Sequence, residues 1–484
     1  MHRIARGRAA FAAVFVCAIC TPSAWSQSFW SDPFNTDSKV APAPGVRWDS
    51  PDPLPAVKSP AQAEQIRSAA PLTLPELTEF ALRNNSRTRQ AWLAARAAAA
   101  GVGIEQADRL PQITALASIS RLEPVSGTTG VAAAWQIRYG PSISLSYVLF
   151  DFGVREYQIE SAEYRLLATN LTQNRVLQDV VFQVEQAYYQ LLGLEALVRT
   201  NELSLTNSRT ALEAVQKRRE SGLATVADVY RVETQVAQAQ LNLTRSQGDF
   251  EKAKGQLAAS VGLPVNQSLR VQTLNEQPQI RAMTDAMSTL LERAKANRPD
   301  LVAAEAQARA ARATANATAK AGLPSIEIAG AAGHTQTRFS DDHRSANNYA
   351  LGLSLRIPLF SGFRDTYSVR QAEAQAGLAE AARDSLYRQT ELDVWQAYYE
   401  LLTAASTIGS TEAQVKSAEQ TAQATLARYQ AGFGSILDLI TAQQDESSAR
   451  VQRIQSYLGW FTALARLNFS VGMNDILMAA SDKK

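Results

Sequence analysis

The sequence predicts a mainly α-helical protein with a transmembrane β-barrel part, built from a duplicated helix–β-hairpin–helix unit. The first supporting observation is an internal repeat: motifs between residues 149 and 262 recur 210 residues later without insertion or deletion. The second is a set of four segments, each of about ten residues, in which apolar and polar side chains alternate. A repeat on this scale indicates two copies of one structural unit that pack as neighbours.

The N-terminus is predicted to be a secretory signal peptide covering residues 1–26. Arginines at positions 3, 6 and 8 precede an apolar run over residues 9–19, and small residues stand at Ala24 and Ser26 before the expected cleavage. The apolar run is too short to span a bilayer as a helix. The protein is therefore expected to be exported from the cytoplasm.

Both cysteines of the chain, Cys17 and Cys20, lie within this segment. A lipoprotein signal anchored at one of them is the alternative interpretation. Val16 or Ile19 would then stand where such a signal has a small residue. After cleavage the chain has no cysteine, which excludes disulfides and thiolate metal sites.

The charge balance of the mature chain gives no reason to expect a nucleic-acid partner. Three of the 48 Lys and Arg residues lie in the signal segment, which leaves 45 against 46 Asp and Glu residues and a net charge near −1. No stretch reaches the roughly 18 apolar residues that mark a transmembrane helix. A membrane role therefore has to come from strands.

The segment 27–72 is a proline-rich arm, because prolines at this density interrupt both helices and strands. A disordered leader and an arm that lies on a neighbouring subunit both remain open for it. The first repeat, 73–262, starts a helix with Pro75 and Glu76 in the first turn, and Pro111 ends this helix. The elements expected in this repeat are one helix over 73–110, strands at 111–120 and 141–150, a long helix over 151–221 and a helix over 225–259.

A linker over residues 263–281 separates the repeats, and a tail over 473–484 follows the second one. The second repeat, 282–472, has the same order of elements, and side chains alternate around Ile326 and Leu353 as they do in the first. The elements expected in it are a first helix, strands at 324–333 and 349–358, a long helix over 361–431 and a helix over 435–469.

The long helices set this chain apart from ordinary globular domains. The segments 142–263 and 359–484 contain no proline, so each long helix can run for about 69 residues, on the order of 100 Å. Gly222 matches a helix-ending glycine, and Thr225 with Asp228 forms a capping box that starts the next helix. The two shorter helices of a repeat together match the long one, which predicts a second column packed against it.

Four strands cannot close a barrel, and unpaired sheet edges are not tolerated in lipid. A soluble hairpin with one buried face is the alternative for each strand pair, but four amphipathic segments behind a signal peptide favour the barrel. The remaining strands must then come from other copies of the chain. Eight strands from two copies and twelve from three both close the sheet, and only the larger barrel leaves an obvious aqueous lumen.

The corner where each second strand meets its long helix reads Leu149-Phe150-Asp151 and, in the second repeat, Leu359-Phe360-Ser361. Together with the repeated Ala-Tyr-Tyr-x-Leu-Leu and Gly-x-x-(Ser/Thr)-x-x-Asp motifs, residues 73–472 resemble the TolC family of outer-membrane channel proteins. The resemblance implies a homotrimer with a twelve-stranded barrel in outer-membrane lipid and a long periplasmic α-helical tunnel. It also implies two partners, a periplasmic adaptor (membrane fusion) protein and an inner-membrane pump of the RND, MFS or ABC type, for efflux or type I secretion.

By the same resemblance, the turns after the long helices are the periplasmic tips. The resemblance implies that Gly222, Leu223, Gly432 and Phe433 form the turns that contact the adaptor, that Asp228, Asp438 and Tyr429 line the entrance, and that Phe150 and Phe360 mark the barrel-to-tunnel corners. Gly434 replaces a basic residue of some relatives, and Thr441 replaces a second aspartate. A charge-paired lock is therefore in doubt here, and helix capping is the simpler role for both aspartates.

No catalytic constellation is found, so the chain is not expected to be an enzyme or to bind a cofactor. His334 and His343 are placed in the polar stretch between strands, and two histidines without cysteines do not predict a metal site. No phosphate-binding loop is found, so the energy for transport has to come from a partner. The alternative function is a periplasmic coiled-coil adaptor or scaffold without a pore, which explains the long helices but not the four amphipathic strands.

Overall fold

The computed structural model describes residues 71–122, 135–267, 269–272, 286–339 and 342–473. These residues all belong to the second of two compact units, which spans residues 63–484. The expected signal peptide, nearly all of the proline-rich arm and of the C-terminal tail, and the second half of the inter-repeat linker lie outside the described residues.

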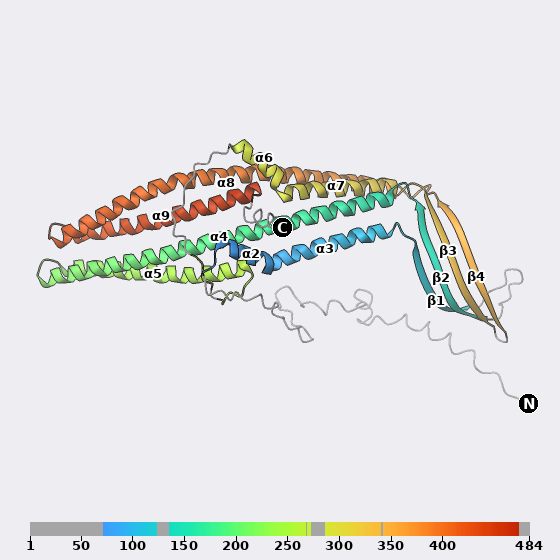
Figure 1. The fold of residues 1–484 in the computed structure, drawn as a ribbon, viewed down its shortest axis with the longest axis horizontal. Helices are drawn as coiled ribbons and strands as arrows, with labels where there is room; N and C mark the ends of the chain where they lie inside the picture. The colour runs from blue at the N-terminus through green and yellow to red at the C-terminus, as the bar shows by residue number, and fades with distance from the viewer. Residues whose placement is uncertain (1–70, 123–134, 268, 273–285, 340–341, 474–484) are drawn as a thin grey trace, which may run out of the picture. The chain divides into compact units, whose positions relative to one another are not determined.

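The two repeats form the same order of elements (Figure 1). The first contains helices α2 (Leu74–Asn84) and α3 (Ser86–Ala107), strands β1 (Gln112–Leu122) and β2 (Gln136–Phe150), and helices α4 (Val154–Glu220) and α5 (Val226–Val261). The second contains helices α6 (Met287–Asn297) and α7 (Pro299–Lys320), strands β3 (Ser325–Arg338) and β4 (His343–Arg356), and helices α8 (Arg364–Gln430) and α9 (Ile436–Val471). Within the described ranges, no helix combines the length and the apolarity that crossing a bilayer requires.

The four strands form one antiparallel sheet in the order β1-β2-β3-β4. Its register places like side chains on the same face: Leu145 lies opposite Ile113, and Ser144 lies opposite Thr114. One face of the sheet is therefore apolar and the other is polar or small. The apolar face includes the exposed side chains of Ile113, Ile119, Ile143, Leu353 and Leu355.

The first helix of each repeat is broken, which corrects the expectation of one continuous helix over 73–110. Asn85 has an extended backbone; its Oδ1 accepts a bond from the Arg87 amide, and its Nδ2 donates to the Ser260 carbonyl, both at 2.9 Å. The Asn85 side chain thus caps α3 and also binds α5. These two hydrogen bonds stabilise the break more than a continuous helix would be stabilised at this point. In the second repeat Pro299 favours the same break, because the residue before a proline avoids the helical conformation.

The strands extend further into the polar segments than expected. β2 begins at Gln136 rather than 141, β3 ends at Arg338 rather than 333, and β4 begins at residue 343 rather than 349. His334 and His343 therefore lie within β3 and β4, and not between strands. Polar cross-strand pairs take the place of apolar alternation there, since His334 Nδ1 lies 2.8 Å from Asn347 Oδ1.

Two further boundaries differ for local reasons. β4 ends at Arg356 rather than at 358, because Pro358 has no amide hydrogen to donate to a strand ladder. The long helices α4 and α8 begin at residues 154 and 364, later than the expected 151 and 361. Phe152 and Phe363 have left-handed backbone conformations at these corners, which delays the helices.

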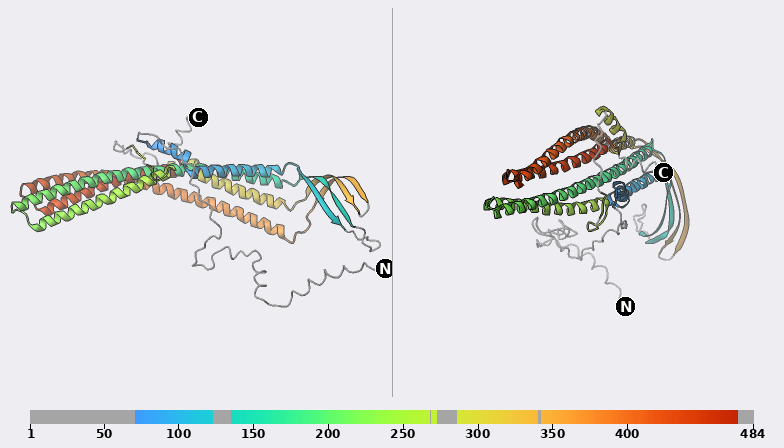
Figure 2. Two further views of the ribbon diagram at one scale, coloured as in Figure 1. Left: turned by 90° about the horizontal axis from the view of Figure 1, so that it is seen from below. Right: turned by 60° about the vertical axis from the view of Figure 1, so that its left-hand side comes forward.

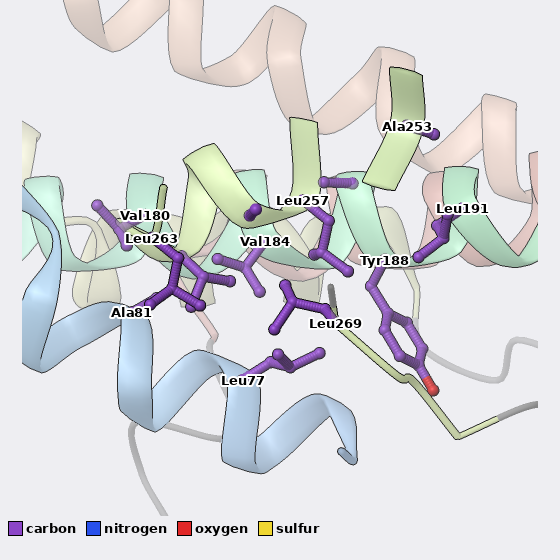
Figure 3. Packing of buried hydrophobic residues seen from close by; sticks show 13 residues of the cluster. Leu77, Ala81, Val180, Val184, Tyr188, Leu191, Ala253, Leu257, Leu263 and Leu269 are labelled. Atoms are coloured by element: carbon purple, nitrogen blue, oxygen red, sulfur yellow. The ribbon is translucent and has the colours of Figure 1, made fainter. Parts of the chain in front are cut away.

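Helix α4 of the first repeat contacts helices of both repeats. It packs against α3 and α5 of its own repeat and against α7 and α9 of the other, and Figure 2 shows the hairpins α4–α5 and α8–α9 side by side. The middle of α4 carries a buried cluster in which Val184 and Leu191 pack with Leu77 of α2 and Leu257 of α5 (Figure 3). This cluster joins the short helices to the long one, which gives the second column that the lengths predicted.

An ion-pair network centred on the buried Arg298 joins the repeats near the middle of the long helices. The Arg298 guanidinium, almost fully buried, lies 2.6 Å from Asp300 and 3.3 Å from Asp393. Arg175 of α4 lies 3.9 Å from the same Asp300 and 3.8 Å from the ring centroid of Phe469 on α9. Because Arg298 is buried, leaving its charge without a carboxylate partner is destabilising, so the network fixes how the repeats meet at this level.

Candidate functional site

The two helical hairpins end in matching turns. Gly222 and Gly432 take left-handed conformations, with φ of +73° and +88°, which are strained for any residue with a β-carbon. The amide of the next residue, Leu223 or Phe433, donates back to a carbonyl in the last turn of the helix, at 2.8 and 2.9 Å. The side chains of Leu223 and Phe433 are left exposed, so each turn presents one large apolar residue.

Asp228 and Asp438 occupy equivalent positions in the helices that follow these turns. Asp228 Oδ2 accepts bonds from the Thr225 amide (3.0 Å) and the Thr225 hydroxyl (2.8 Å), so the predicted capping box is confirmed. These bonds, the amide foremost, hold the pKa of Asp228 below its usual value and keep it ionised. Asp438 is exposed, and its amide donates to Ser435 Oγ at 3.1 Å.

Tyr429 is buried where the two hairpins of the chain meet. Arg218 reaches across from α4 and donates from Nη1 to the Tyr429 carbonyl, with its guanidinium 4.8 Å from the centroid of the Tyr429 ring. Burial raises the pKa of the Tyr429 hydroxyl; the charge of Arg218 opposes this rise and the charge of Asp228 adds to it. Asp228 and Tyr429, which were predicted separately, therefore lie in one neighbourhood.

An apolar cluster surrounds this contact. Its buried members are Ala211, Val215, Val229 and Val232 from the first hairpin and Tyr429, Ile436, Leu439 and Ile440 from the second. Further along, Gln235 Nε2 donates to Gln443 Oε1 at 3.2 Å. Among the described residues the Tyr429 hydroxyl and Arg218 Nε are buried without a hydrogen-bond partner. Apolar packing thus holds the hairpins of one chain together, with the Arg218 bond to the Tyr429 carbonyl and the Gln235–Gln443 bond beside it.

Arg218 is the residue of this site to which sequence reasoning gave no role. Its only sequence signal is its recurrence as Arg428 in the second repeat. Recurrence marks a shared position but does not name the contact, because Tyr429, the partner of Arg218, lies 211 residues away. The contact is visible only in the folded chain.

Phe150 and Phe360 lie at the corners between the strands and the long helices. Phe150 contacts Phe152 edge to face at 4.8 Å between ring centroids, and Phe360 contacts Phe363 at 5.4 Å. All four rings are exposed in the single chain. Each corner therefore presents a pair of aromatic rings where the sheet passes into the helices. No three His, Cys, Asp or Glu side chains of the described part of the chain gather to hold a metal ion.

Comparison with known proteins finds one family across both repeats. The family model for the outer membrane efflux protein matches residues 77–263 and 290–473. CyaE of Bordetella pertussis is 25% identical over 413 residues, 85% of this chain and 84% of the relative. The outer membrane efflux protein BepC of Brucella suis is 23% identical over 377 residues, 78% and 80% of the two chains. The solved structure of the outer-membrane channel OprN superposes with a TM-score of 0.76 at 21% identity, over 83% of this chain and 90% of that one.

Proposed function

We propose that this chain, which belongs to the outer membrane efflux protein family, forms as a homotrimer the exit channel of a tripartite efflux or type I secretion system. It is an outer-membrane protein of a Gram-negative bacterium with a periplasmic extension. Its cargo reaches it from an inner-membrane pump of the RND, MFS or ABC type through a periplasmic adaptor protein. The observation that carries the proposal is a four-stranded sheet with an exposed apolar face and two outer strands.

The sheet fits the wall of a barrel in lipid. Its apolar face, which includes Ile113 and Leu353, suits contact with acyl chains, and its face of serines, threonines and small residues suits a water-filled lumen. β1 and β4 are the outer strands of the sheet in the described residues. Their free edges require partners within a bilayer, so β4 of one copy pairs with β1 of the next.

The packing of the two repeats within one chain is the template for the contact between copies. α4 packs against α7 and α9 of the following repeat. Its equivalent, α8, packs in the same way against α3 and α5 of the next copy, and the exposed side chains of Trp395 and Tyr399 on α8 and Trp92 on α3 are available for this contact. Three copies supply twelve strands, which leaves an aqueous lumen, and their long helices form the periplasmic tunnel.

The tips supply the adaptor contact and the entrance. Leu223 and Phe433 project from the Gly222 and Gly432 turns as exposed apolar anchors of the kind that dominate protein–protein contacts. We assign Asp228, Asp438 and Tyr429 to the entrance, where Tyr429 packs between the two hairpins of the chain. The Phe150 and Phe360 corners mark the passage from barrel to tunnel.

Extraction and mass measurement test this function. A barrel protein leaves the membrane fraction only with detergent, whereas the alternative, a periplasmic coiled-coil scaffold without a pore, is released by salt or alkali. We expect native mass measurement in detergent to give three chains. A stable monomer in detergent, or release without detergent, would remove the argument for the barrel.

A further inference from the structure

The end of the sheet that lies away from the helices carries basic side chains. In the second hairpin Ser325 and Arg356 lie at the end that joins the helices, so Arg338 and His343 lie at the opposite end (Figure 1). Arg121 lies at this same end in the first hairpin. The helices are periplasmic in the function proposed above, on which the following assignment rests. The end with these basic residues therefore lies at the outer surface of the membrane.

The register of the strands determines which face of the sheet these residues occupy. Directly paired residues of neighbouring strands share a face. Arg121 pairs with Ile137, and Ile137 pairs with Arg338. Arg338 in turn pairs with His343. These four residues form one row across the sheet, here called the basic row. The row lies on the apolar face, because Arg121 follows Ile113 in the same strand at an even spacing.

The rest of the apolar face carries no competing charge. Tyr139 and Tyr349 are exposed, and they stand between the basic row and aliphatic side chains such as Leu145 and Leu351. Among the described strand residues, this face has no Asp or Glu, and its only Lys or Arg side chains are the two arginines of the basic row. Tyrosines beside an apolar band mark the boundary between hydrocarbon and headgroups. The basic row therefore lies at the level of the lipid headgroups.

The Arg338 guanidinium is available to a ligand. Arg338 is exposed, and no carboxylate of the described residues forms an ion pair with it. Asp342, the acidic residue beside this end of β4, lies 2.9 Å from Arg344. Arg344 pairs in register with Thr337, the neighbour of Arg338 in β3, so it belongs to the polar face. The charge of Asp342 is thus matched by an arginine of the other face.

The two arginines of the basic row are spaced for a ligand with more than one anionic group. Arg121 and Arg338 lie two strands apart, which separates their backbones by on the order of 10 Å. The Arg121 guanidinium lies 5.3 Å from the centroid of the Trp135 ring, a cation–π contact at the end of the sheet. Guanidinium groups bind phosphate through paired N–H donors. A headgroup with two phosphates can therefore contact both arginines.

We propose that the basic row binds the phosphate groups of lipid A, the bisphosphorylated glycolipid that anchors lipopolysaccharide in the outer leaflet. Arg121 and Arg338 bind the phosphates, and the acyl chains lie along the apolar face toward the helices. A phospholipid or free phosphate offers the same anionic chemistry. Two guanidinium groups on one face, with aliphatic side chains on one side of them, favour a ligand that has two phosphates and acyl chains.

Removing charge from one face of the sheet, and comparing it with the other face, tests this site. R121Q/R338Q removes both guanidinium groups of the basic row, and R338Q alone removes the one without an ion pair. R138Q/R344Q is the matched control, because Arg138 and Arg344 lie at the same end of the sheet on its polar face and are also exposed. Each purified trimer is titrated in detergent with lipid A, phosphatidylglycerol or inorganic phosphate. Native mass spectrometry counts the molecules bound to each trimer.

Lipid A is expected to bind the parent trimer and R138Q/R344Q equally, R338Q at least about threefold more weakly, and R121Q/R338Q at least about tenfold more weakly. Equal lipid A binding by R121Q/R338Q and R138Q/R344Q would overturn the site. Phosphatidylglycerol bound as tightly as lipid A, or lipid A displaced by equimolar inorganic phosphate, would overturn the assignment to lipid A. A detergent-solubilised monomer would instead overturn the channel assembly itself, so the failures are distinguishable.

Discussion

Asp228 combines two roles that are physically compatible. Its carboxylate accepts the Thr225 amide and hydroxyl, which ties the start of α5 to the turn that precedes it. The same bonds lower its pKa, so the side chain keeps its charge in the neutral periplasm. A capping residue at a narrow opening therefore also contributes a fixed negative charge.

Replacing the tip aspartates tests the second role. In a trimer, Asp228 and Asp438 place up to six carboxylates around the entrance, and such a ring favours cations by direct attraction. D228N/D438N keeps a capping oxygen at each site and removes the charge. We expect the cation-over-anion permeability ratio in planar bilayers to fall by at least about twofold, with the trimer intact.

A charge-matched control belongs with this experiment. D249N/D384N removes two exposed carboxylates from α5 and α8 away from the turns, and its selectivity should match that of the parent protein. Unchanged selectivity in a correctly assembled D228N/D438N trimer would leave these aspartates as helix caps only.

At the scale of elements, the two repeats solve the same packing problem with different chemistry. In each repeat the first helical segment is broken into two short helices. A side chain at the break donates to a backbone carbonyl shortly before the glycine that ends the packed helix, α5 or α9. Asn85 donates to the Ser260 carbonyl at 2.9 Å, and Arg298 donates to the Ser470 carbonyl at 3.5 Å. The glycine that follows, Gly472 in the second repeat, lets the two backbones approach closely.

Alanine at that glycine measures the close approach. Gly472 has φ +78°, and an added β-carbon would lie 2.8 Å from both the carbonyl carbon and the carbonyl oxygen of Asn297. Gly222 has a similar φ of +73° with open space around it, so G222A is a control for backbone strain alone. G222A should cost about 1 to 2 kcal/mol, and G472A about 1 to 3 kcal/mol more because backbone must move.

Chemical denaturation followed by helical circular dichroism checks this difference. Equal midpoints for G472A and G222A would mean that the chain relaxes at Asn297 without cost, and that the close approach is not needed for stability.

At the scale of the whole molecule, repeat equivalence distinguishes surface that stays exposed from surface that a second copy covers. Leu378 on α8 is 72% exposed, whereas its equivalent on α4, Ala168, is 3% exposed. The position is covered wherever the following repeat is present. Leu378 is therefore expected to be buried between copies, although in one chain it resembles an ordinary surface leucine.

A charge at this position tests the assembly. L378E places a carboxylate in the expected contact between copies, where burying it unpaired is costly. We expect the trimer yield in detergent, measured by native mass, to fall several-fold. L203E is the matched control, because Leu203 and its equivalent Ala413 are both exposed, so neither faces a neighbouring repeat. Equal trimer yields from the two variants would contradict the use of one repeat contact as the template for the other.

The sequence by itself determined the features that depend on local order. The long helices follow from proline-free segments, the sheet follows from alternation with period two, and the tip turns follow from Gly222 and Gly432 ahead of capping residues. The constant repeat spacing also determined that the two halves have the same architecture. These features need only neighbours a few residues away, so their signals lie close together in the chain.

Only the tertiary structure decided which side chains meet across the repeats. The break at Asn85 depends on a carbonyl 175 residues away, and the contact of Arg218 depends on Tyr429, 211 residues away. The charges of Arg298 and Asp393 look like surface charges in the sequence, yet Arg298 is buried and Asp393 pairs with it. Periodicity reports which face of an element is apolar, but it does not report which element covers that face, because the choice depends on packing of the whole chain.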